Sequence, residues 1–444
     1  MYNFKKGYYA DVRVEDRFTT NIRLQNGQLH EAKEMTEKKA FIRVFDGSMW
    51  YYTSTCDVDN IQAELDDLYR YAHANADIDN NPVVKLYEAN KDKKIVFENR
   101  CVKNVPFAEK LQLIQSTSER IKSELCTFKV AQYIDRYSLY NFYSSKGADI
   151  TYDFQTCGVA YSMAFAKGEE NMQEQLSKAE TSFDKLAYSD SELAEFVKRC
   201  EDFITNAKPV VAGSYPVVLA PIVTGVFAHE SFGHKSESDF MLGDESMIKE
   251  WALGKKVGSD ILTIRETGVF EGSGYVPYDD EGTRATDTYL IKNGVLAGRL
   301  HSAETAAALG ENLTGNARAI NCDFEPIVRM TSTFVENGDS TFDQLVAGIK
   351  HGYYIYTVKH GSGMSTFTIA PNIAYEIVDG KVAGPVKIAV ITGNVFETLG
   401  LIDGVANDKK LLSFVTGGCG KMEQYPLNVG MGGPHIRVSK MNVQ

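Results

Sequence analysis

Two imidazoles and a carboxylate fall within six positions of the chain, as His229, Glu230 and His234. Neutral imidazoles bind a borderline-soft divalent metal ion, and a carboxylate beside the first of them can take a proton from water on that ion. The apolar run from Tyr215 to Ala220 precedes them and reads as a buried strand. This stretch of the chain therefore indicates a catalytic metal site.

The two histidines are five residues apart, whereas the familiar H-E-x-x-H motif places them four apart on one helix face. Five residues of ideal helix turn the second imidazole roughly 140° away from the first, so the two would not face one ion. Either the helix contains a one-residue π-bulge, or it ends near Gly233 and His234 follows on a looser turn. The alternative interpretation is that His229 and His234 are ordinary helix residues and that Glu230 is a solvated charge, because short motifs also occur by chance.

A catalytic zinc ion takes three protein ligands and leaves a fourth position open for water. Candidates for the third ligand are the cysteines, Glu237, His301, His351, His360 and His435. Cys419 has the most distinctive setting, because the glycines around it let the backbone turn tightly and Lys421 favours the thiolate. The other interpretation of Cys419 is a small residue in a turn. Two imidazoles with a thiolate favour zinc over magnesium or calcium, and would also accept iron or cobalt.

The composition is that of an acidic globular protein, with 444 residues, 43% of them hydrophobic, and a formal net charge of -12. A chain of this length buries large cores and is expected to form two domains. The negative charge and the lack of any basic cluster argue against nucleic acid or an anionic membrane as a partner. No apolar stretch resembles a signal peptide or a membrane span, so we expect a cytoplasmic protein with reduced cysteines.

Residues 1–207 are expected to form an amino-terminal α+β domain of antiparallel strands and helices. Strand-like alternation over residues 10–52 is broken at Asn26-Gly27 and Asp46-Gly47, which predicts an antiparallel meander. The further elements expected in this domain are a helix over 61–72 capped by Asp57 or Asp59, a helix over 111–125, strands between 128 and 165, and two polar helices within 170–206.

Residues 208–444 are expected to form a β-rich domain that carries the HExxxH helix, with the boundary at Ala207-Lys208-Pro209. Hairpin turns are expected at Asn293-Gly294 and Asp379-Gly380, and a short helix that starts with Ser340 as its cap. The loop over 272–283 contains Asp279-Asp280-Glu281 and reads as a flexible site loop or lid, or as a solvated turn.

Several spaced motifs occur in one order along the chain. They are His229-Glu230-x-x-x-His234 with Glu237, Asp239 and Phe240 behind it, Asp279-Asp280-Glu281-Gly282-Thr283, Thr314-Gly315-Asn316, Pro326-x-x-Arg329-Met330, Gly393-Asn394 and Gly418-Cys419-Gly420-Lys421. Together they resemble the TldD/PmbA family of zinc metallopeptidases, also called modulators of DNA gyrase. The similarity covers nearly the whole chain and is most specific over residues 208–438.

The resemblance implies that His229, His234 and Cys419 bind zinc, that Glu230 is the catalytic carboxylate, and that the five-residue spacing is the family's own. Members are either active TldD-like chains or TldE/PmbA-like partners that lack the metal residues. This sequence keeps all four residues, so it resembles the active kind. Relatives usually begin with an additional helix, and the resemblance assigns no role to His435.

The function that the resemblance implies is hydrolysis of unfolded or short peptides, held as a strand in a narrow cleft of a dimer. The partner would be a second copy or a TldE/PmbA-like paralogue. One alternative is a cysteine peptidase with Cys419 as nucleophile and His229 or His234 as base. Another is a non-enzymatic peptide-binding or scaffold protein, with no metal or with a structural zinc that has Glu237 as its fourth ligand.

Overall fold

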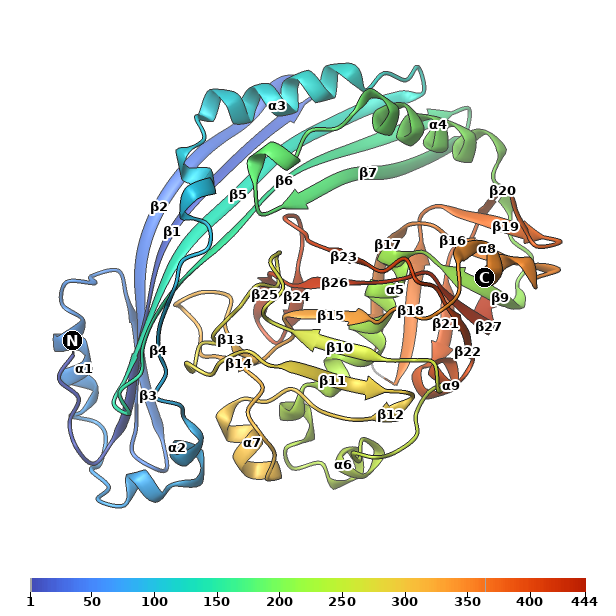
Figure 1. The fold of residues 1–444 in the computed structure, drawn as a ribbon. Coiled ribbons are helices and arrows are strands. Elements are labelled where there is room, and N and C mark those ends of the chain that lie inside the picture. The colour runs from blue at the N-terminus through green and yellow to red at the C-terminus, as the bar shows by residue number, and fades with distance from the viewer. Residues whose placement is uncertain (1, 364) are drawn as a thin grey trace.

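One curved sheet takes up most of the first 180 residues of the computed structural model, which describes residues 2–363 and 365–444 (Figure 1). Its strands are β1 Tyr9–Gln25, β2 Gln28–Phe45, β3 Trp50–Thr55, β4 Lys91–Lys94, β5 Cys126–Ser144, β6 Asp149–Lys167 and β7 Glu170–Glu180. Their order is β3-β2-β1-β5-β6-β4, with β7 also on β6. The sheet arches over the rest of the chain.

The predicted amino-terminal meander is confirmed, because β1, β2 and β3 pair in antiparallel succession. Asn26 and Gly27 join β1 to β2 with φ angles of 46° and 81°. A two-residue hairpin needs such positive φ angles, and Asn and Gly adopt them at the least cost.

Four helices flank this sheet: α1 Ile61–Leu68, α2 Pro82–Leu86, α3 Phe107–Arg120 and α4 Asp190–Asn206. α1 packs on one end of the sheet through Ile61 and Leu65, and α3 and α4 cover the other end (Figure 1). The predicted cap of α1 is wrong, because Asn60 holds the cap position without a capping side-chain bond. Asp57 accepts a hydrogen bond of 2.7 Å from the Asn60 side chain instead.

Two polar helices are expected within residues 170–206, and the prediction of the first is wrong, because Glu170–Glu180 is strand β7. Its side chains alternate, with Met172 and Leu176 partly buried against β6 and their neighbours exposed. Glu and Gln favour a helix locally, but the backbone bonds offered by β6 outweigh that preference.

The chain beyond α4 builds two larger sheets with short helices. The ten-stranded sheet contains β8 Lys208–Pro209, β9 Gly213–Leu219, β16 His351–Ile355, β17 Val358–Gly363, β18 Thr366–Pro371, β19 Ala374–Val378, β20 Lys381–Lys387, β21 Ile391–Asn394, β22 Ile402–Val405 and β27 Ile436–Val443. The six-stranded sheet contains β10 Ile264–Thr267, β11 Asp287–Lys292, β12 Val295–Leu296, β15 Ser332–Val335, β23 Lys410–Leu412 and β26 Gly430–Gly433.

Two small hairpins and five helices complete this part. They are β13 Ala317–Arg318 with β14 Ile327–Val328, β24 Cys419–Lys421 with β25 Gln424–Leu427, α5 Pro221–Ala228, α6 Glu245–Glu250, α7 Ala303–Leu309, α8 Phe342–Ala347 and α9 Val395–Gly400. α5 lies between the two larger sheets and contacts β9 and β17 of one, and β15 and β26 of the other. α8 is capped by Thr341, whose side chain accepts the Gln344 N–H, so the predicted Ser340 cap is wrong.

The acidic loop over residues 272–283 is buried, so its prediction as a flexible lid or a solvated turn is wrong. The side chains of Asp279 and Glu281 are 3% and 4% exposed. Asp279 accepts backbone N–H bonds from within the loop, and Glu281 lies 3.4 Å from Arg43 of β2. Asp280 lies 3.0 Å from Arg13 of β1. Ion pairs with the curved sheet make this loop a fixed contact between the two parts of the chain.

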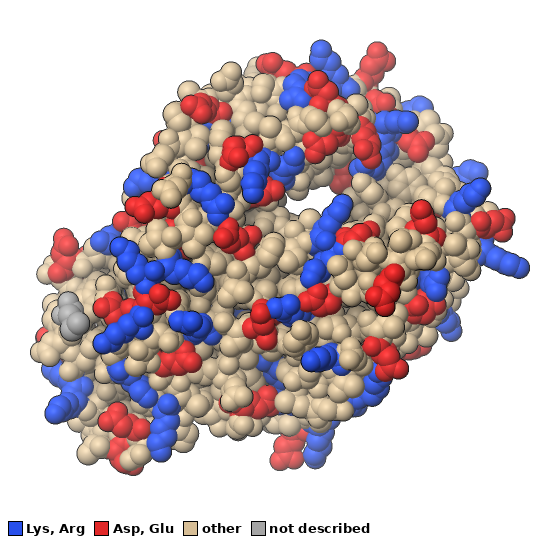
Figure 2. All heavy atoms as spheres, viewed as in Figure 1, with Lys and Arg blue, Asp and Glu red and all other residues tan. Residues whose placement is uncertain are grey.

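The mixture of sheets and separate helices agrees with the predicted α+β class. Among the described residues, the helices are too short or too polar to span a bilayer. Figure 2 shows acidic and basic side chains intermixed on the visible face, and an opening beneath the curved sheet.

Candidate metal centre

The histidine motif lies where α5 changes its winding. α5 ends at Ala228, a π turn spans His229–Gly233, and a 3-10 turn spans His234–Ser236. A π turn takes up one extra residue per turn, so the five-residue spacing places both imidazoles on the same side. Their ring centroids lie 4.9 Å apart. Of the two deformations that the spacing allowed, the structure has the π deformation.

The packing of α5 against the six-stranded sheet depends on a glycine. A Cβ atom at Gly225 would lie 2.7 Å from the backbone nitrogen of Gly432 in β26. Any larger residue would push the helix away from the sheet. Val223 and Phe227 of α5 are fully buried in the surrounding core. The helix therefore holds His229 at a defined distance from β26.

Cys419 reaches the two histidines from strand β24, 185 positions away from His234 in the sequence. The Cys419 Sγ lies 3.5 Å from the His234 Nε2, and the three ligand atoms all lie within 4.8 Å of one another. Cys419 is 3% exposed. The structure thus brings together the three residues that the resemblance assigns to zinc.

The charges of this group depend on the contact between thiol and imidazoles. Burial opposes ionisation of Cys419, but His229 and His234 lower its pKa to about 5. Burial also opposes protonation of His234, but its hydrogen bonds to Cys419 and Glu237 raise its pKa to about 10. At neutral pH the metal-free centre therefore contains a thiolate, which is the form of cysteine that binds metals.

Glu237 lies behind His234. Its Oε2 is 3.1 Å from the His234 Nδ1 and 3.1 Å from the Lys421 Nζ. Lys421 also donates to Asp239 and to the Val328 carbonyl, so it does not face the thiol as predicted. Burial by itself would raise the pKa of Glu237, but His234 and Lys421 lower it by more. The pKa therefore lies below its ordinary value, and the carboxylate is charged. Glu237 follows His234 by three residues, and this spacing places the two side chains on the same side of a turn. The spacing is the signal in the sequence that predicts this contact.

Arg329 makes a contact that the sequence did not reveal. Its side chain is fully buried, and its Nη2 donates to the Cys419 carbonyl at 2.9 Å. Its Nη1 donates to the Gln424 carbonyl at 3.3 Å, across the same hairpin. Arg329 thereby fixes the hairpin that presents Cys419. An arginine carries no local sequence signal for the carbonyl that it will reach.

Glu230 follows His229 on the π turn and is partly exposed. Burial raises its pKa, while His229 and His234 act in the opposite direction. A Cβ atom at Gly361 of β17 would lie 3.2 Å from the Glu230 Cγ. The glycine in β17 therefore lets that strand pass close to the carboxylate.

Two imidazoles and a thiolate form a donor set that fits zinc, with the other ring nitrogen of His234 held by Glu237. His229 Nδ1 is buried and lacks a hydrogen-bond partner among the described residues. A buried imidazole nitrogen without a partner is costly unless something else binds it. The donor chemistry and this open valence both suit a metal ion.

The other candidate ligands lie outside this group. His301 binds Ser238 and Glu311, and His351 binds Glu376 at the surface. His360 is exposed on β17. His435 binds Asp408 and Tyr354. In the described part of the chain, none of the four joins the cluster of His229, His234 and Cys419.

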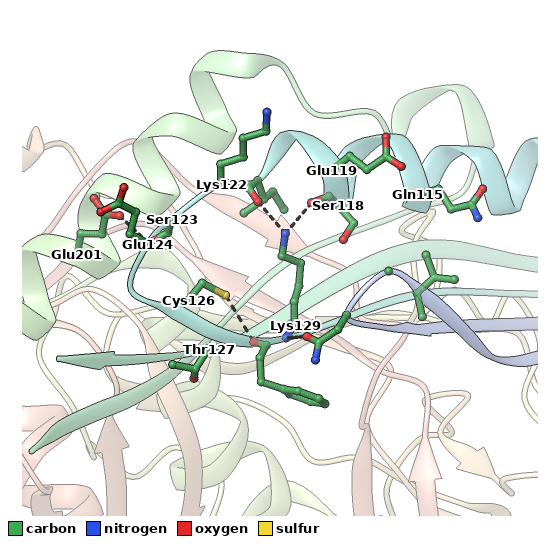
Figure 3. A pocket seen from close by; sticks show the side chains of 15 residues that line it. Gln115, Ser118, Glu119, Lys122, Ser123, Glu124, Cys126, Thr127, Lys129 and Glu201 are labelled. Carbon is green, nitrogen blue, oxygen red and sulfur yellow. Dashed lines mark hydrogen bonds between the residues drawn. The ribbon is translucent and has the colours of Figure 1, made fainter. Parts of the chain in front are cut away.

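A hollow of about 770 Å³ lies elsewhere, at the end of α3 beside the start of β5 (Figure 3). Its polar groups already bind one another: Lys129 donates to the carbonyls of Ser118 and Ile121, and Ser123 donates to Glu201. Burial raises the pKa of Cys126 in this hollow, which keeps the thiol unreactive. The hollow lacks the convergent groups of the metal centre.

Known proteins resemble this chain along its whole length. A metalloprotease of Methanothermobacter thermautotrophicus is 32% identical over 437 residues, covering 97% of this chain and 94% of that protein. A zinc metalloprotease TldD homolog of Saccharolobus solfataricus is 27% identical over 441 residues, covering 98% and 96%. TldE of Thermococcus kodakarensis shares the fold, with a TM-score of 0.77 at 17% identity over 98% of this chain and 96% of that one.

Two family models match the chain. The PmbA/TldA metallopeptidase C-terminal domain matches residues 212–444, which include His229, His234 and Cys419, and domain 1 of the same family matches residues 10–76. The first match spans more than half of the chain, and the Methanothermobacter thermautotrophicus metalloprotease is 32% identical over 97% of it. The chain therefore belongs to the TldD/PmbA metallopeptidase family, as its spaced motifs predict.

Proposed function

We propose that this protein is a zinc-dependent peptidase that hydrolyses unfolded or short peptides bound in extended form. The observation that carries the proposal is the cluster of His229, His234 and Cys419, whose ligand atoms lie within 4.8 Å of one another beside Glu230. These three residues would hold the ion. Zinc bound there would polarise the scissile carbonyl and lower the pKa of water.

Glu230 is proposed as the general base. In hydrolysis the water oxygen bonds to the carbonyl carbon, the C–N bond breaks, and one water proton moves to the leaving nitrogen. Glu230 would accept that proton and pass it to the amine. Burial raises the pKa of Glu230 from its ordinary value, which brings it closer to the pH at which transfer in both directions is efficient.

Glu237 is proposed to position His234. By accepting a hydrogen bond from the His234 Nδ1, it leaves the Nε2 lone pair for the metal. Lys421 keeps this carboxylate charged from the far side. A buried pair of this kind orients the imidazole and increases its basicity as a ligand.

The proposed binding of an extended peptide rests on strand β17. In the part of the chain that the structure describes, β17 pairs with β18 and ends the ten-stranded sheet. An extended peptide can add to such an edge through main-chain hydrogen bonds, with little demand on its side chains. Because Gly361 and Gly363 of β17 pass close to Glu230, a peptide on this edge would run beside the metal centre.

A partner chain is also proposed, either a second copy or a TldE/PmbA-like paralogue. TldE of Thermococcus kodakarensis shares the fold of this chain. Such a paralogue would lack the metal residues, so the active centre would belong to the present chain.

The test compares wild type with Glu230→Gln after both have been incubated with zinc and desalted. Both should retain zinc, because Glu230 is outside the ligand set. Cleavage of unfolded peptides by the variant should fall by about 10²- to 10⁴-fold, since a general base supplies that much. Cleavage by Glu230→Gln at the wild-type rate would refute the role of Glu230.

The alternatives give different outcomes in a chelation experiment. A zinc peptidase loses activity to a chelator and regains it with zinc. A cysteine peptidase retains activity after chelation and loses it in Cys419→Ala. A binding protein holds peptides without cleaving them in every variant.

A further inference from the structure

A small hollow lies between the curved sheet and the β24–β25 hairpin, with a volume of about 40 Å³. Arg136 of β5 and Tyr152 of β6 line it from the sheet. Tyr275 of the loop over residues 272–283, Arg318 of β13 and Leu427 of β25 line it from the other part of the chain. One water molecule needs roughly 10–15 Å³ of such space, so the hollow has room for a few waters or for one ion of several heavy atoms.

Arg318 brings a buried charge to this hollow, because the residue is only 6% exposed. Its Nη2 donates to the Asn428 carbonyl at 2.8 Å, and its Nη1 donates to the Met330 carbonyl. These carbonyls satisfy hydrogen bonds but carry no charge, and within the described residues Arg318 has no ion-pair partner. A guanidinium does not lose its proton in a protein. A buried charge without a counter-charge is costly.

The pKa of Arg318 reflects these surroundings. Burial lowers the pKa, and the neighbouring guanidinium of Arg329 lowers it further. Asp280 and Glu266 act in the opposite direction but do not reverse the shift. Asp280 is already paired with Arg13, at 3.0 Å. The protein's own acidic groups therefore balance the charge of Arg318 only in part.

Arg136, the second guanidinium of the hollow, shares its carboxylate with another arginine. The Arg136 Nη2 and the Arg17 Nη2 each lie 2.6 Å from Glu15, at different oxygens of that carboxylate. Among the described residues that line the hollow, none is acidic. Arg17, Arg136 and Arg318 thus bring three positive charges to this region, against the one negative charge of Glu15. Two positive charges are left over.

Two tyrosine hydroxyls add neutral donors to the hollow. Tyr275 is 2% exposed, and its hydroxyl has no hydrogen-bond partner among the described residues. A buried donor without a partner is costly, so such a group in a folded protein points to a missing ligand or water. Burial raises the pKa of Tyr152 well above its ordinary value, against the opposing effect of Arg318. The Tyr152 hydroxyl therefore stays protonated and can donate.

We propose that this hollow binds one small tetrahedral oxyanion, phosphate or sulfate, between the guanidinium groups of Arg136 and Arg318. The hydroxyls of Tyr152 and Tyr275 donate to the same ion. A doubly negative ion balances the two excess positive charges. Guanidinium groups match the oxygens of such an ion with pairs of parallel N–H bonds. The volume suits the free ion and not a whole nucleotide or peptide.

The position of the hollow gives the ion a structural effect. Arg136 and Tyr152 belong to the curved sheet, whereas Leu427 belongs to the hairpin that carries Cys419 and pairs with Cys419 itself. A bound ion therefore ties the curved sheet to the hairpin that presents the thiolate. Because the unfolded chain lacks the site, the temperature of unfolding rises as the ion concentration increases.

The test titrates inorganic phosphate into the full chain by isothermal titration calorimetry, at an ionic strength held constant with chloride. The chain is used both loaded with zinc and after treatment with a chelator, because phosphate can also bind to zinc. Both forms should bind one phosphate per chain, with dissociation constants that agree. Sulfate should compete for the site. Acetate, with one charge and two oxygens, should compete much more weakly.

Three variants test the donors. Arg318→Lys keeps the charge but loses the planar fork, so the dissociation constant for phosphate should rise about tenfold or more. Tyr152→Phe and Tyr275→Phe should each raise it up to about tenfold, because each removes one hydrogen bond to a charged group. Tyr188→Phe is the matched control, since its hydroxyl is also buried without a partner but lies in the core between the curved sheet and its helices. It should bind phosphate as wild type does.

Thermal unfolding separates loss of a donor from loss of the fold. Tyr275→Phe removes a buried hydroxyl that has no partner, so without phosphate the variant should unfold at the wild-type temperature or above it. With phosphate, its unfolding temperature should rise less than that of wild type. A variant that is damaged in its fold would already unfold at a lower temperature without phosphate.

Four results would overturn the proposal. They are a wild type without saturable phosphate binding at millimolar concentrations, binding that disappears after chelation, acetate that competes as well as sulfate, and an affinity that Arg318→Lys and both hollow-lining tyrosine variants leave unchanged. Binding that needs zinc would place the phosphate on the metal. The readouts are heat and unfolding temperature, so they are independent of the proposed peptidase activity, and failure of either proposal leaves the other standing.

Discussion

Two histidines of this protein have nearly the same immediate partners and different surroundings. His234 has a carboxylate, Glu237, at its Nδ1 and a thiol, Cys419, at its Nε2. His435 likewise has Asp408 at its Nδ1, at 2.6 Å, and the Tyr354 hydroxyl at its Nε2, at 3.0 Å. The two imidazoles are equally covered, with side chains 13% and 14% exposed.

The difference lies one contact further out. Glu237 is completely buried and is held by Lys421, whereas the side chain of Asp408 is 36% exposed. Burial lowers the pKa of His435 despite its carboxylate, whereas the pKa of His234 rises to about 10. A second imidazole, His229, also faces Cys419, so three ligand atoms converge at this place. Both His234 and His435 therefore have a carboxylate hydrogen-bonded to Nδ1. The metal centre differs in having three converging donor atoms.

The largest expected effect separates the two histidines by their metal content. His234→Ala should lose most of its zinc after desalting, because two protein ligands hold zinc far more weakly than three. His435→Ala should keep the wild-type zinc content, since its imidazole lies outside the donor cluster. Elemental analysis per chain measures both. Equal zinc loss in the two variants would contradict the assignment of His234, and not His435, to the metal centre.

A smaller effect should separate the two carboxylates. Glu237→Gln keeps the shape of the side chain and removes its charge, so zinc affinity should fall by about 10- to 100-fold. Asp408→Asn makes the same change beside His435 and should leave the affinity at the wild-type value. Competition with a zinc-binding dye gives both dissociation constants. Unchanged affinity in Glu237→Gln would show that Glu237 does not support the ligand.

The smallest expected effect is a proton count. The thiolate of Cys419, with a pKa of about 5, and protonated His234, with a pKa of about 10, carry one proton between them near neutral pH. Zinc displaces that proton, so release from this pair should stay near one from about pH 6 to about pH 9. Calorimetry in buffers of different ionisation enthalpy, with Cys419→Ala as reference, measures this release.

Ordinary pKa values would give a different pH profile. A thiol near pH 8.5 and an imidazole near pH 6.5 would release more protons below about pH 6.5 and fewer above about pH 8.5. A sloping profile would therefore contradict the coupling of Cys419 with His234. His435 should contribute nothing to it, which His435→Ala would check.

Several features could be predicted from the sequence because they depend on the conformational preferences of a few neighbouring residues. The hairpin turns at Asn26-Gly27 and Asn293-Gly294 follow from the backbone angles that these residues adopt, and the structure has both. The HExxxH motif and the spaced glycine and acidic motifs predict the family. The domain boundary after residue 207 stays a prediction, although β8 from Lys208 pairs in a different sheet from β7.

The sequence by itself determined the residue types that can bind a metal and the tight turns, because each depends on residues close together in the chain. The order of its spaced motifs determined the family. Only the tertiary structure decided which residues meet. Cys419 reaches His234 through a hairpin fixed by Arg329, and α5, which packs close to β26 at Gly225, continues into the π turn that carries both histidines. The strand β7 and the buried carboxylate of Glu281 likewise depend on distant partners, β6 and Arg43, whose contacts outweigh local preference.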